Sequence, residues 1–576
     1  MAFSQTPCEF SQKHLIKSNR IGAYIYNDGT LFHDGEDGGF IFPYHEGEGP
    51  STIGRALLWA GGVDPGGNLK FAAAGNGTSN GLSDFRPGPL DPQTGLPYSD
   101  IPCQYFNQIW TISAKEVYSF IEDWEDNGKI DHDHESIFNW PGAGNPFWGV
   151  SLLPKTSQGW APFYDQNLDG IYNPLEGDFP ALYPSLGWEI LIPKELNWCV
   201  YNDASEHLLT DALPIKIEVQ QTSFVLDCDS QPEVENSVFV HYKFINRAAE
   251  DIDSFYAGIA IDLDIGCPGD DSFGSIPSLS SFYVYNEDQN DGGEFGCEDS
   301  EGYGNFPPIM GIRFFEFQQQ AFSALENFIY FLTSDNPLHP GNSLPEEPIE
   351  YYQYLTGSWK DGTSLTYGGT GYNIGSTDYT SHVFSGNPNL SNEWIYEIPV
   401  YDTTGNEVIS LGSTGFHNPW NNSGAGKIQP GKSLEMTIAF SCFSQTGFNH
   451  IEMIDKMIID DLRNLNEAIY PDYSQAVLNG PYCKSYSTEK PEEQEVETSF
   501  VSGIFPNPTS GVLNIAIEDT IIEEVAIYNT SWQLLYIDKK PKNELQVIDL
   551  QGFAYGLYFL RLKLDGQTLV KKILIN

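Results

Sequence analysis

The stretch Ser237-Val-Phe-Val-His-Tyr-Lys-Phe-Ile245 predicts the fold class of this chain. It is rich in β-branched and aromatic residues and has no Gly or Pro, which favours a β-strand. Many of the 56 Gly and 37 Pro residues lie between such apolar runs, a texture typical of strands joined by long loops. The sequence therefore predicts a mainly β, multidomain protein with β-sandwich regions and a few helices. Further strands are expected at Ile215–Val219, Phe255–Ile261, 309–315, 327–332 and 434–443.

Two stretches have helical periodicity. In residues 113–127, Ser113 and Glu116 form a capping box ahead of an apolar face. Residues 449–469 carry an apolar stripe whose i, i+3, i+4 spacing is typical of a helix packed on a sheet. The apolar positions are Val117, Phe120, Ile121 and Trp124 in the first stretch, and Ile451, Ile454, Ile458, Leu462 and Leu465 in the second.

The 576 residues allow about three to five domains. We expect residues 1–205 to form a loop-rich mixed β region that includes the first helix. Residues 206–483 are predicted to form a β-sandwich region with an acidic loop and the second helix. Residues 484–498 are polar, acidic and almost without large apolar side chains, which indicates a linker. A compact pattern of short alternating strands fills residues 499–576.

The net charge of −51 excludes some partners. Nucleic acid is not an expected partner, because phosphate binding needs clustered Lys and Arg. The 79 acidic residues have two interpretations, a solvated surface or carboxylates gathered around divalent cations, and both stay open. The sequence has no apolar run of about 18 residues, so no transmembrane segment is predicted. No complete signal peptide is visible, but residues 1–5 resemble the end of one, so we expect that the true start of the precursor lies upstream or that its hydrophobic region was removed.

A calcium-binding loop is the strongest chemical motif. Residues 165–176 fit the pattern D-x-[DN]-x-[DN]-G-x5-E. In such a loop alternate side chains converge on one ion, and a Gly makes the sharp turn between them. A carbonyl and a bidentate Glu complete an oxygen shell suited to Ca²⁺. The predicted ligands are Asp165, Asn167, Asp169, Ile171 through its carbonyl, Asn173 and Glu176.

A second acidic cluster follows a predicted strand. Asp262 and Asp264 project to one face at the end of that strand, and further acids follow in the next loop. Crowded carboxylates repel one another unless a cation or protons intervene, and Ca²⁺ is the expected cation. A solvated acidic loop is an equal alternative, because no fixed spacing supports a site. The candidate ligands are Asp262, Asp264, Asp270, Asp271 and Asp288.

The eight cysteines form no C-x-x-C pair, which argues against a zinc ribbon. Cys267 and Cys297 flank the acidic loop and are the best candidates for a disulfide, although buried free thiols are an alternative. Asp131-His-Asp-His134 could hold a metal, but four adjacent ligands seldom wrap one ion, so the pattern favours a surface turn.

Two common catalytic motifs, H-E-x-x-H and the phosphate loop, are missing from the sequence. A Cys–His nucleophile and a glycosidase pair of carboxylates stay open, because pairing in space is invisible here. Several Trp residues could line a sugar-binding surface, but a role in the core is favoured. These are Trp59, Trp110, Trp140, Trp148, Trp160, Trp188 and Trp198.

The C-terminal region opens with Ile504-Phe-Pro-Asn-Pro-Thr-Ser-Gly511 and continues with Glu524-Val-Ala-Ile-Tyr-Asn529, Tyr555-Gly-Leu-Tyr-Phe-Leu560 and Lys571-Lys-Ile-Leu574. In this order at the chain terminus, these motifs resemble the C-terminal (type A) sorting domain of type IX secretion cargo. A Gly usual after Tyr-Asn is replaced by Thr530-Ser-Trp532. The alternating strands predict a small Ig-like β-sandwich.

The resemblance implies export across both membranes of a Gram-negative envelope, with the type IX machinery as the partner of residues 499–576. Such a domain is typically removed, and the cargo is released or anchored to surface polysaccharide. Residues 56–64, 84–89, 165–180 and 261–266 also resemble large secreted proteins that carry this domain, a resemblance that transfers no activity.

The expected function is that of a secreted or cell-surface protein of adhesive or structural type, stabilised by Ca²⁺. Its ligand is either a glycan or a protein. The alternative is a secreted carbohydrate-active hydrolase, so enzymatic activity is left undecided.

Overall fold

Two compact units make up the computed structural model of the protein. The main unit comprises residues 1–149, 160–166 and 172–485, and the second comprises residues 150–159, 167–171 and 486–576. The structure describes residues 11–17, 20–34, 38–45, 49–75, 83–98, 103–147, 160–182, 190–226, 232–267, 270–292, 302–315, 324–333, 341–390, 392–396, 408–416, 426–444, 501–505, 509, 511–517, 522–528, 534–538, 545–550, 553, 556–564 and 567–575.

The first large sheet of the main unit is antiparallel and has the strand order β21-β22-β15-β6-β3-β2-β4-β5, with β1 paired to β2 and β7 paired to β6. Its strands are β1 (Lys13–Lys17), β2 (Gly22–Tyr26), β3 (Thr30–Leu31), β4 (Phe40–Ile41), β5 (Ser51–Ile53), β6 (Arg55–Val63), β7 (Leu69–Ala73), β15 (Asp253–Asp262), β21 (Asn327–Leu332) and β22 (Val408–Thr414).

The second large sheet is also antiparallel, in the order β16-β17-β20-β23-β14-β13-β12-β8, with β9 paired to β12. Its strands are β8 (Arg86–Pro87), β9 (Trp110–Ser113), β12 (Glu195–Asn202), β13 (Ile217–Val225), β14 (Ser237–Asn246), β16 (Asp271–Ile276), β17 (Ser281–Asn286), β20 (Ile309–Phe315) and β23 (Ser433–Phe443). Two short ladders join β10 (Phe163–Tyr164) to β11 (Phe179–Pro180) and β18 (Asn290–Asp291) to β19 (Gly304–Asn305).

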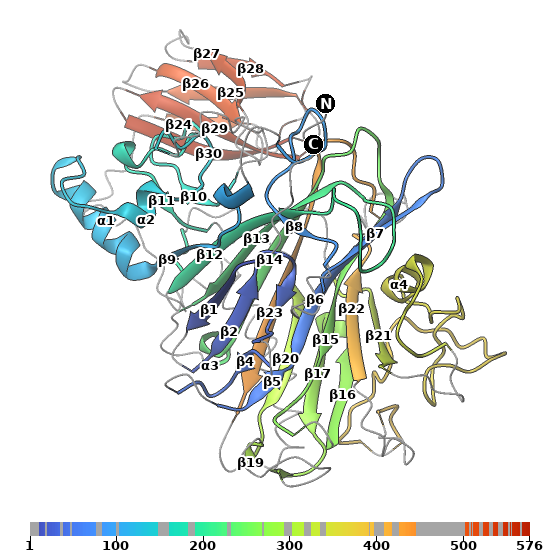
Figure 1. The fold of residues 1–576 in the computed structure, drawn as a ribbon. Helices are drawn as coiled ribbons and strands as arrows, with labels where there is room; N and C mark the ends of the chain where they lie inside the picture. Colours follow the sequence, from blue (N-terminus) through green and yellow to red (C-terminus); the bar gives the residue numbers. More distant parts are fainter. Residues whose placement is uncertain are drawn as a thin grey trace, which may run out of the picture. The chain divides into compact units, whose positions relative to one another are not determined.

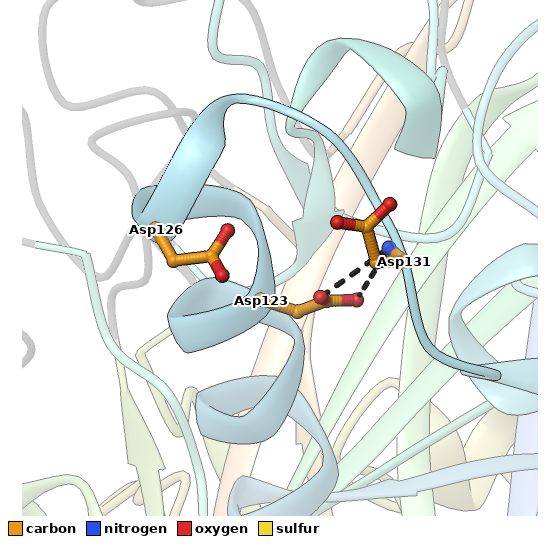
Figure 2. Close-up of side chains that lie close together, drawn as sticks. All are labelled: Asp123, Asp126 and Asp131. Atoms are coloured by element: carbon orange, nitrogen blue, oxygen red, sulfur yellow. Dashed lines mark hydrogen bonds between the residues drawn. The ribbon is translucent and has the colours of Figure 1, made fainter.

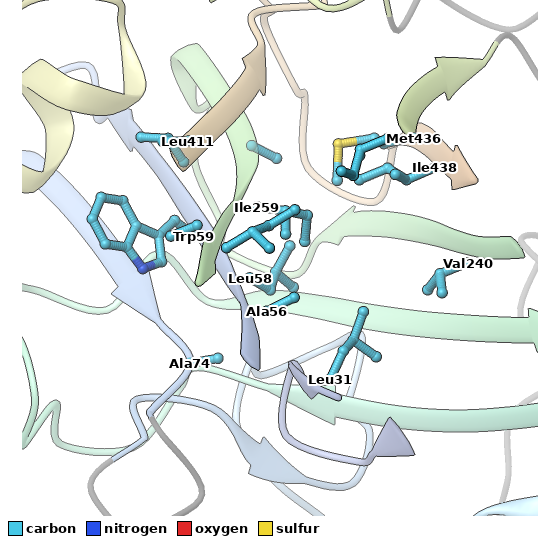
Figure 3. Packing of buried hydrophobic residues seen from close by; sticks show 14 of the residues in the cluster. Leu31, Ala56, Leu58, Trp59, Ala74, Val240, Ile259, Leu411, Met436 and Ile438 are labelled. Carbon is cyan, nitrogen blue, oxygen red and sulfur yellow. The ribbon is translucent and has the colours of Figure 1, made fainter. Parts of the chain in front are cut away.

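The two large sheets pack face to face and share one hydrophobic core. Figure 3 shows side chains from both sheets meeting there, with Leu58 and Ile259 from the first sheet and Val240 and Ile438 from the second. The predicted β-sandwich is therefore confirmed in the main unit.

Aromatic rings cross between the two sheets. Phe282 of β17 stacks on Phe328 of β21, with ring centroids 4.6 Å apart. A Cβ at Gly412 of β22 would lie 2.6 Å from the Phe282 ring, so only Gly lets the sheets approach this closely.

The predicted first helix is confirmed as α1 (Ala114–Asn127). Ser113 caps it, and the reciprocal bonds between Ser113 and Glu116 form the expected capping box. Helix α4 (Pro348–Leu355) packs against β6, β7 and β22 (Figure 1). The other helices among the described residues are short: η1 (Cys103–Tyr105), α2 (Glu135–Phe138), η2 (Pro174–Glu176), α3 (Pro232–Glu235) and η4 (Pro277–Leu279).

Residue 205 does not separate two units of structure, contrary to the sequence-based division. β6 pairs with β15 in the first sheet, and β12 pairs with β13 in the second. Each pair joins a strand before residue 205 to one after it, so 1–205 and 206–483 cannot be separate domains. The predicted helix at 449–469 and the predicted linker at 484–498 lie outside the described residues.

The second unit contains a smaller sandwich of two antiparallel sheets. Their apolar faces form a separate core that includes Leu513 and Ile548 of one sheet and Ile527 and Leu560 of the other. This agrees with the predicted C-terminal β-sandwich. The first of these sheets contains β24 (Val501–Phe505), β25 (Val512–Ile517) and β28 (Leu545–Asp549). The second contains β27 (Leu534–Asp538), β26 (Ile522–Tyr528), β29 (Gly556–Leu564) and β30 (Gln567–Ile575).

Phe282→Ala should lower the free energy of unfolding of the main unit by about 3–5 kcal/mol, because it leaves a cavity between the two sheets. Urea denaturation measures this loss. Ile374→Ala is the control, since Ile374 is 83% exposed and its loss should cost no more than about 0.5 kcal/mol. Equal effects of the two substitutions would contradict the inter-sheet packing of Phe282.

Candidate functional site

The predicted calcium loop connects two paired strands. β10 and β11 pair Phe163 with Pro180 and Tyr164 with Phe179, which brings the ends of the loop together. Asp178 is fully buried and accepts the N–H groups of Gln166 and Asn173, both at 2.8 Å. Asp178 therefore joins the two ends of the loop through these hydrogen bonds, and its side chain is buried rather than exposed.

Within the loop the chain turns tightly where the motif requires it. Leu168 and Gly170 adopt left-handed backbone conformations, with φ of 58° and 77°. Asn167 Oδ1 accepts the Asp169 N–H at 3.1 Å, and Asp169 Oδ1 accepts the Ile171 N–H at 2.7 Å. These turns hold the alternating oxygen-bearing residues in a fixed local conformation.

The remaining predicted ligands of this loop lie on or beside η2. Asn173 caps η2, because its Oδ1 accepts the Leu175 N–H at 3.2 Å, and Glu176 is exposed at the end of η2. Asp165 is half-buried where the loop leaves β10. The carboxylate oxygens of Asp165, Asp169 and Glu176 do not lie within 4.8 Å of one another, and calcium binding by this loop stays a prediction.

The second predicted cluster lies where β15 ends and β16 begins. A Cβ at Gly54 would lie 3.1 Å from Asp264 Oδ2 and 3.3 Å from Asp262 Oδ2, so both carboxylates face the same point. Arg55 contacts Asp262 at 3.4 Å. The main-chain N–H of Ile265 donates to Asp271 Oδ2 at 2.8 Å.

In the segment 286–292, Asp288 was the predicted ligand, but Asn286 and Asp291 are the residues that contact this cluster. Asn286 is opposite Asp271 in the β16–β17 ladder, and its Nδ2 donates to Asp270 at 3.1 Å. Asp291 is fully buried and accepts the N–H groups of Cys267 and Tyr303. Asp288 is exposed, and its Oδ1 accepts the Asn290 N–H at 2.6 Å. The alternation of side chains along β17 is the signal that separates Asn286 from its neighbours.

Asp123, Asp126 and Asp131 form the one group of three carboxylates in the described part of the chain whose oxygens lie within 4.8 Å of one another (Figure 2). The Asp131 N–H donates to both oxygens of Asp123. Asp123 also accepts the His132 N–H at 3.0 Å and bonds the rings of His132 and His134. Asp123 therefore closes the turn between α1 and α2.

The stretch from Asp131 to His134 was expected to form a surface turn. Asp131, His132 and Asp133 are exposed, as expected, whereas His134 is only 8% exposed. The signal that was missed is Asp123, the partner of both histidines.

Hydrogen bonding shifts the pKa values of this pair. Burial alone would raise the pKa of Asp123, but the hydrogen bonds from His132, His134 and Asp131 outweigh it and hold that pKa well below its usual value. The hydrogen bond that the His132 ring donates to Asp123 raises the pKa of His132.

Another histidine lies in a sealed position. His207 is 3.9 Å from Asp84 and 3.6 Å from Asp203, and all three side chains are fully buried. Asp203 accepts the N–H groups of Ile215 and Ile217, and its pKa is raised by burial. A substrate cannot reach a His–Asp pair of this kind, so its role is to hold the loop before β13.

Two thiols also lie in the core. Cys199 and Cys442 are free and buried, and burial raises the pKa of Cys442 to about 12. A thiol with such a pKa is a poor nucleophile. Cys267 is disulfide-bonded, and its predicted partner Cys297 lies outside the described residues.

The tryptophans belong to the core, as the sequence favoured. Trp148 and Trp188 lie outside the described residues. The exposed fractions of the others are 4% for Trp59, 7% for Trp110, 0% for Trp140, 8% for Trp160 and 1% for Trp198.

Comparison with known proteins identifies the C-terminal sandwich. Residues 503–576 match the family described as the secretion system C-terminal sorting domain. The protein is cargo of the type IX secretion system. This cargo protein is accordingly secreted or displayed on the outer surface of a Gram-negative bacterium. In its described residues, no helix has both the length and the apolar character needed to span a membrane.

Comparisons that extend beyond the sorting domain are weak. An ulvan lyase from Nonlabens ulvanivorans is 22% identical to this cargo protein over 131 residues, which are 22% of this chain and 24% of that protein. The chain therefore matches about a quarter of the length of this curated relative. A solved polysaccharide lyase aligns with 62% of this chain and 34% of its own at 10% identity, with a TM-score of 0.14. A TM-score this low does not establish a shared fold.

The Asp123–His132 pair should make stability depend on pH. The pKa of Asp123 is below its ordinary 3.8, so its ionised form stabilises the fold above about pH 4, and this stabilisation is lost as the pH falls. The pKa of His132 is above its ordinary 6.5, so its charge stabilises the fold below that pH, and this part is lost as the pH rises. Asp123→Asn should therefore lower the melting temperature most between about pH 4 and 6.5.

Thermal melts followed by circular dichroism across this range measure the effect. Asp126→Asn is the control, because Asp126 is exposed and should matter little at any pH. If the difference in melting temperature between wild type and Asp123→Asn stays constant with pH, the ionised Asp123–His132 pair does not cause that difference.

Proposed function

We propose that this exported cargo is a calcium-stabilised surface or secreted module of adhesive or structural type. The observation that carries the proposal is how its buried acidic groups are used. Asp84, Asp178, Asp203 and Asp291 are all buried, and each accepts N–H groups of loops. These carboxylates hold the scaffold together and are not arranged around a reacting group.

Two further features support a binding role over catalysis. Five tryptophans of the first 200 residues are buried in the core and so do not form an exposed platform for cleaving a sugar chain, namely Trp59, Trp110, Trp140, Trp160 and Trp198. The sealed His207 and the buried thiols lie where no substrate reaches them. The partner is proposed to be a glycan or a protein outside the cell, reached after export, with attachment to surface polysaccharide as one route of display.

Calcium is proposed at residues 165–176. The spacing of Asp165, Asn167 and Asp169 suits a hard cation, and the left-handed Gly170 allows the turn between them. The carbonyl of Ile171, Asn173 and Glu176 would complete an oxygen shell, with water in any open position. The chemistry of this donor set fits Ca²⁺ and gives it a structural role.

A second candidate function is cleavage of a polysaccharide. The local similarity to an ulvan lyase favours it. The two candidate functions can be distinguished by the chain length of the polysaccharide, because a lyase shortens it and a binding module leaves it unchanged.

Removal of calcium should lower the melting temperature of the full chain, because an ion that binds only the native state stabilises it. At a free concentration about 100 times its Kd, that stabilisation is about 2.7 kcal/mol. The double substitution Asp165→Asn with Asp169→Asn should reduce the difference between calcium and chelator in scanning calorimetry. Gln166→Ala, at a non-ligand position of the same loop, should leave that difference intact. If chelator does not change the wild-type melt, the loop holds no structural calcium.

The calcium-loaded full chain should bind at least one glycan or extracellular protein without degrading it. Glycan and protein arrays measure binding. Incubation with ulvan and other polysaccharides, followed by reducing-end and ultraviolet assays, measures cleavage. Release of shortened chains would instead establish the second candidate function.

A further inference from the structure

A second cation site is suggested by the group Asp264, Asp270, Asp271, Asn286 and Asp291, here named the sheet-end cluster. Asp264 follows β15 of the first large sheet, whereas Asp271 and Asn286 belong to β16 and β17 of the second. The cluster shares no residue with the loop at 165–176, so it does not depend on the proposed function.

Two side-chain oxygens in this cluster are buried without a hydrogen bond. Asp271 Oδ2 accepts the Ile265 N–H, but Asp271 Oδ1 accepts nothing from the described residues. Asn286 is 1% exposed, and its Oδ1 likewise has no donor among the described residues. Asn286 Nδ2 bonds Asp270, so the amide is oriented into the cluster. Buried oxygens of this kind are usually satisfied by a donor or an ion.

The charges around these oxygens point to an ion rather than a donor. Three further carboxylates, those of Asp264, Asp270 and Asp291, interact electrostatically with Asp271 and add negative charge around it. Such carboxylates favour either protons or a bound cation, and a cation satisfies the two bare oxygens as well.

We propose that Asp271 Oδ1 and Asn286 Oδ1 bind a divalent cation, Ca²⁺ by the chemistry of the donors, with Asp270 and Asp264 beside it. Carboxylate and amide oxygens are typical Ca²⁺ ligands, and water completes the shell. Both proposed ligands belong to the second large sheet and Asp264 follows β15 of the first, so the ion would lie where β15, β16 and β17 end or begin.

Calcium binding to the full chain, stripped with chelator and titrated with Ca²⁺ alone, tests the site. Asp271→Asn keeps the acceptor for Ile265 but removes one ligand oxygen, so it should lose one bound ion per chain or weaken that ion by about tenfold or more. Asp288→Asn is the matched control, because Asp288 lies in the same acidic segment but is exposed. Equal binding by wild type and Asp271→Asn would overturn the proposal.

Asn286→Asp tests the same site from the opposite direction and covers the case in which Asp271→Asn does not fold. It adds a carboxylate beside Asp270 and Asp271. With a cation present this ligand should hold the ion at least as tightly as Asn286 does, whereas in chelator the added charge should lower the melting temperature. If a water molecule rather than an ion occupied the site, Ca²⁺ would not restore the melting temperature of Asn286→Asp. That result would contradict the proposal.

Discussion

Burial of apolar side chains between two antiparallel sheets is the interaction on which the main unit depends. Neither sheet is built from one continuous segment, because β6 pairs with β15 and β14 pairs with β23 across roughly 200 residues each. The rings of Phe282 and Phe328 meet across the interface, as do Phe32 and Phe440. Since a single sheet leaves its apolar face in water, the two sheets are stable only together. The long loops can be irregular because the sandwich holds their ends.

Carboxylates perform much of the work of holding those loops. A chain with net charge −51 has acidic groups in abundance, and many loop N–H groups have no strand partner. Asp84 bonds the N–H groups of Ala73 and Leu209, and Glu218 forms a buried bidentate pair with Arg247. A carboxylate can satisfy two such donors at once, which makes it an efficient way to order a loop inside a sandwich. The acidic composition therefore serves the interior as well as the surface.

The sorting domain is a separate β-sandwich with its own core, so the export signal does not share structure with the main unit. A sorting domain with its own core does not depend on the fold of the protein to which it is attached, and it carries no information on activity. Evidence on activity has to come from the main unit, where the histidines, thiols and tryptophans that might have served a reaction lie mostly inside. Cations at the loop of residues 165–176 and at the sheet-end cluster would add rigidity to a protein that works outside the cell.

The sequence by itself determined what depends on neighbouring residues. Strand character, the capping box of Ser113 and Glu116, the loop motif at 165–176 and the motifs of the sorting domain are all local patterns. Only the tertiary structure decided which strands pair, because hydrophobic alternation is the same for any partner, and this is why a boundary near residue 205 was expected and is absent. Tertiary pairing also placed Asn286 opposite Asp271 and left Asp288 exposed, although both lie in one acidic segment. The burial of His134 against Asp123 was decided in the same way, because proximity in space joins groups that a sequence pattern lists apart.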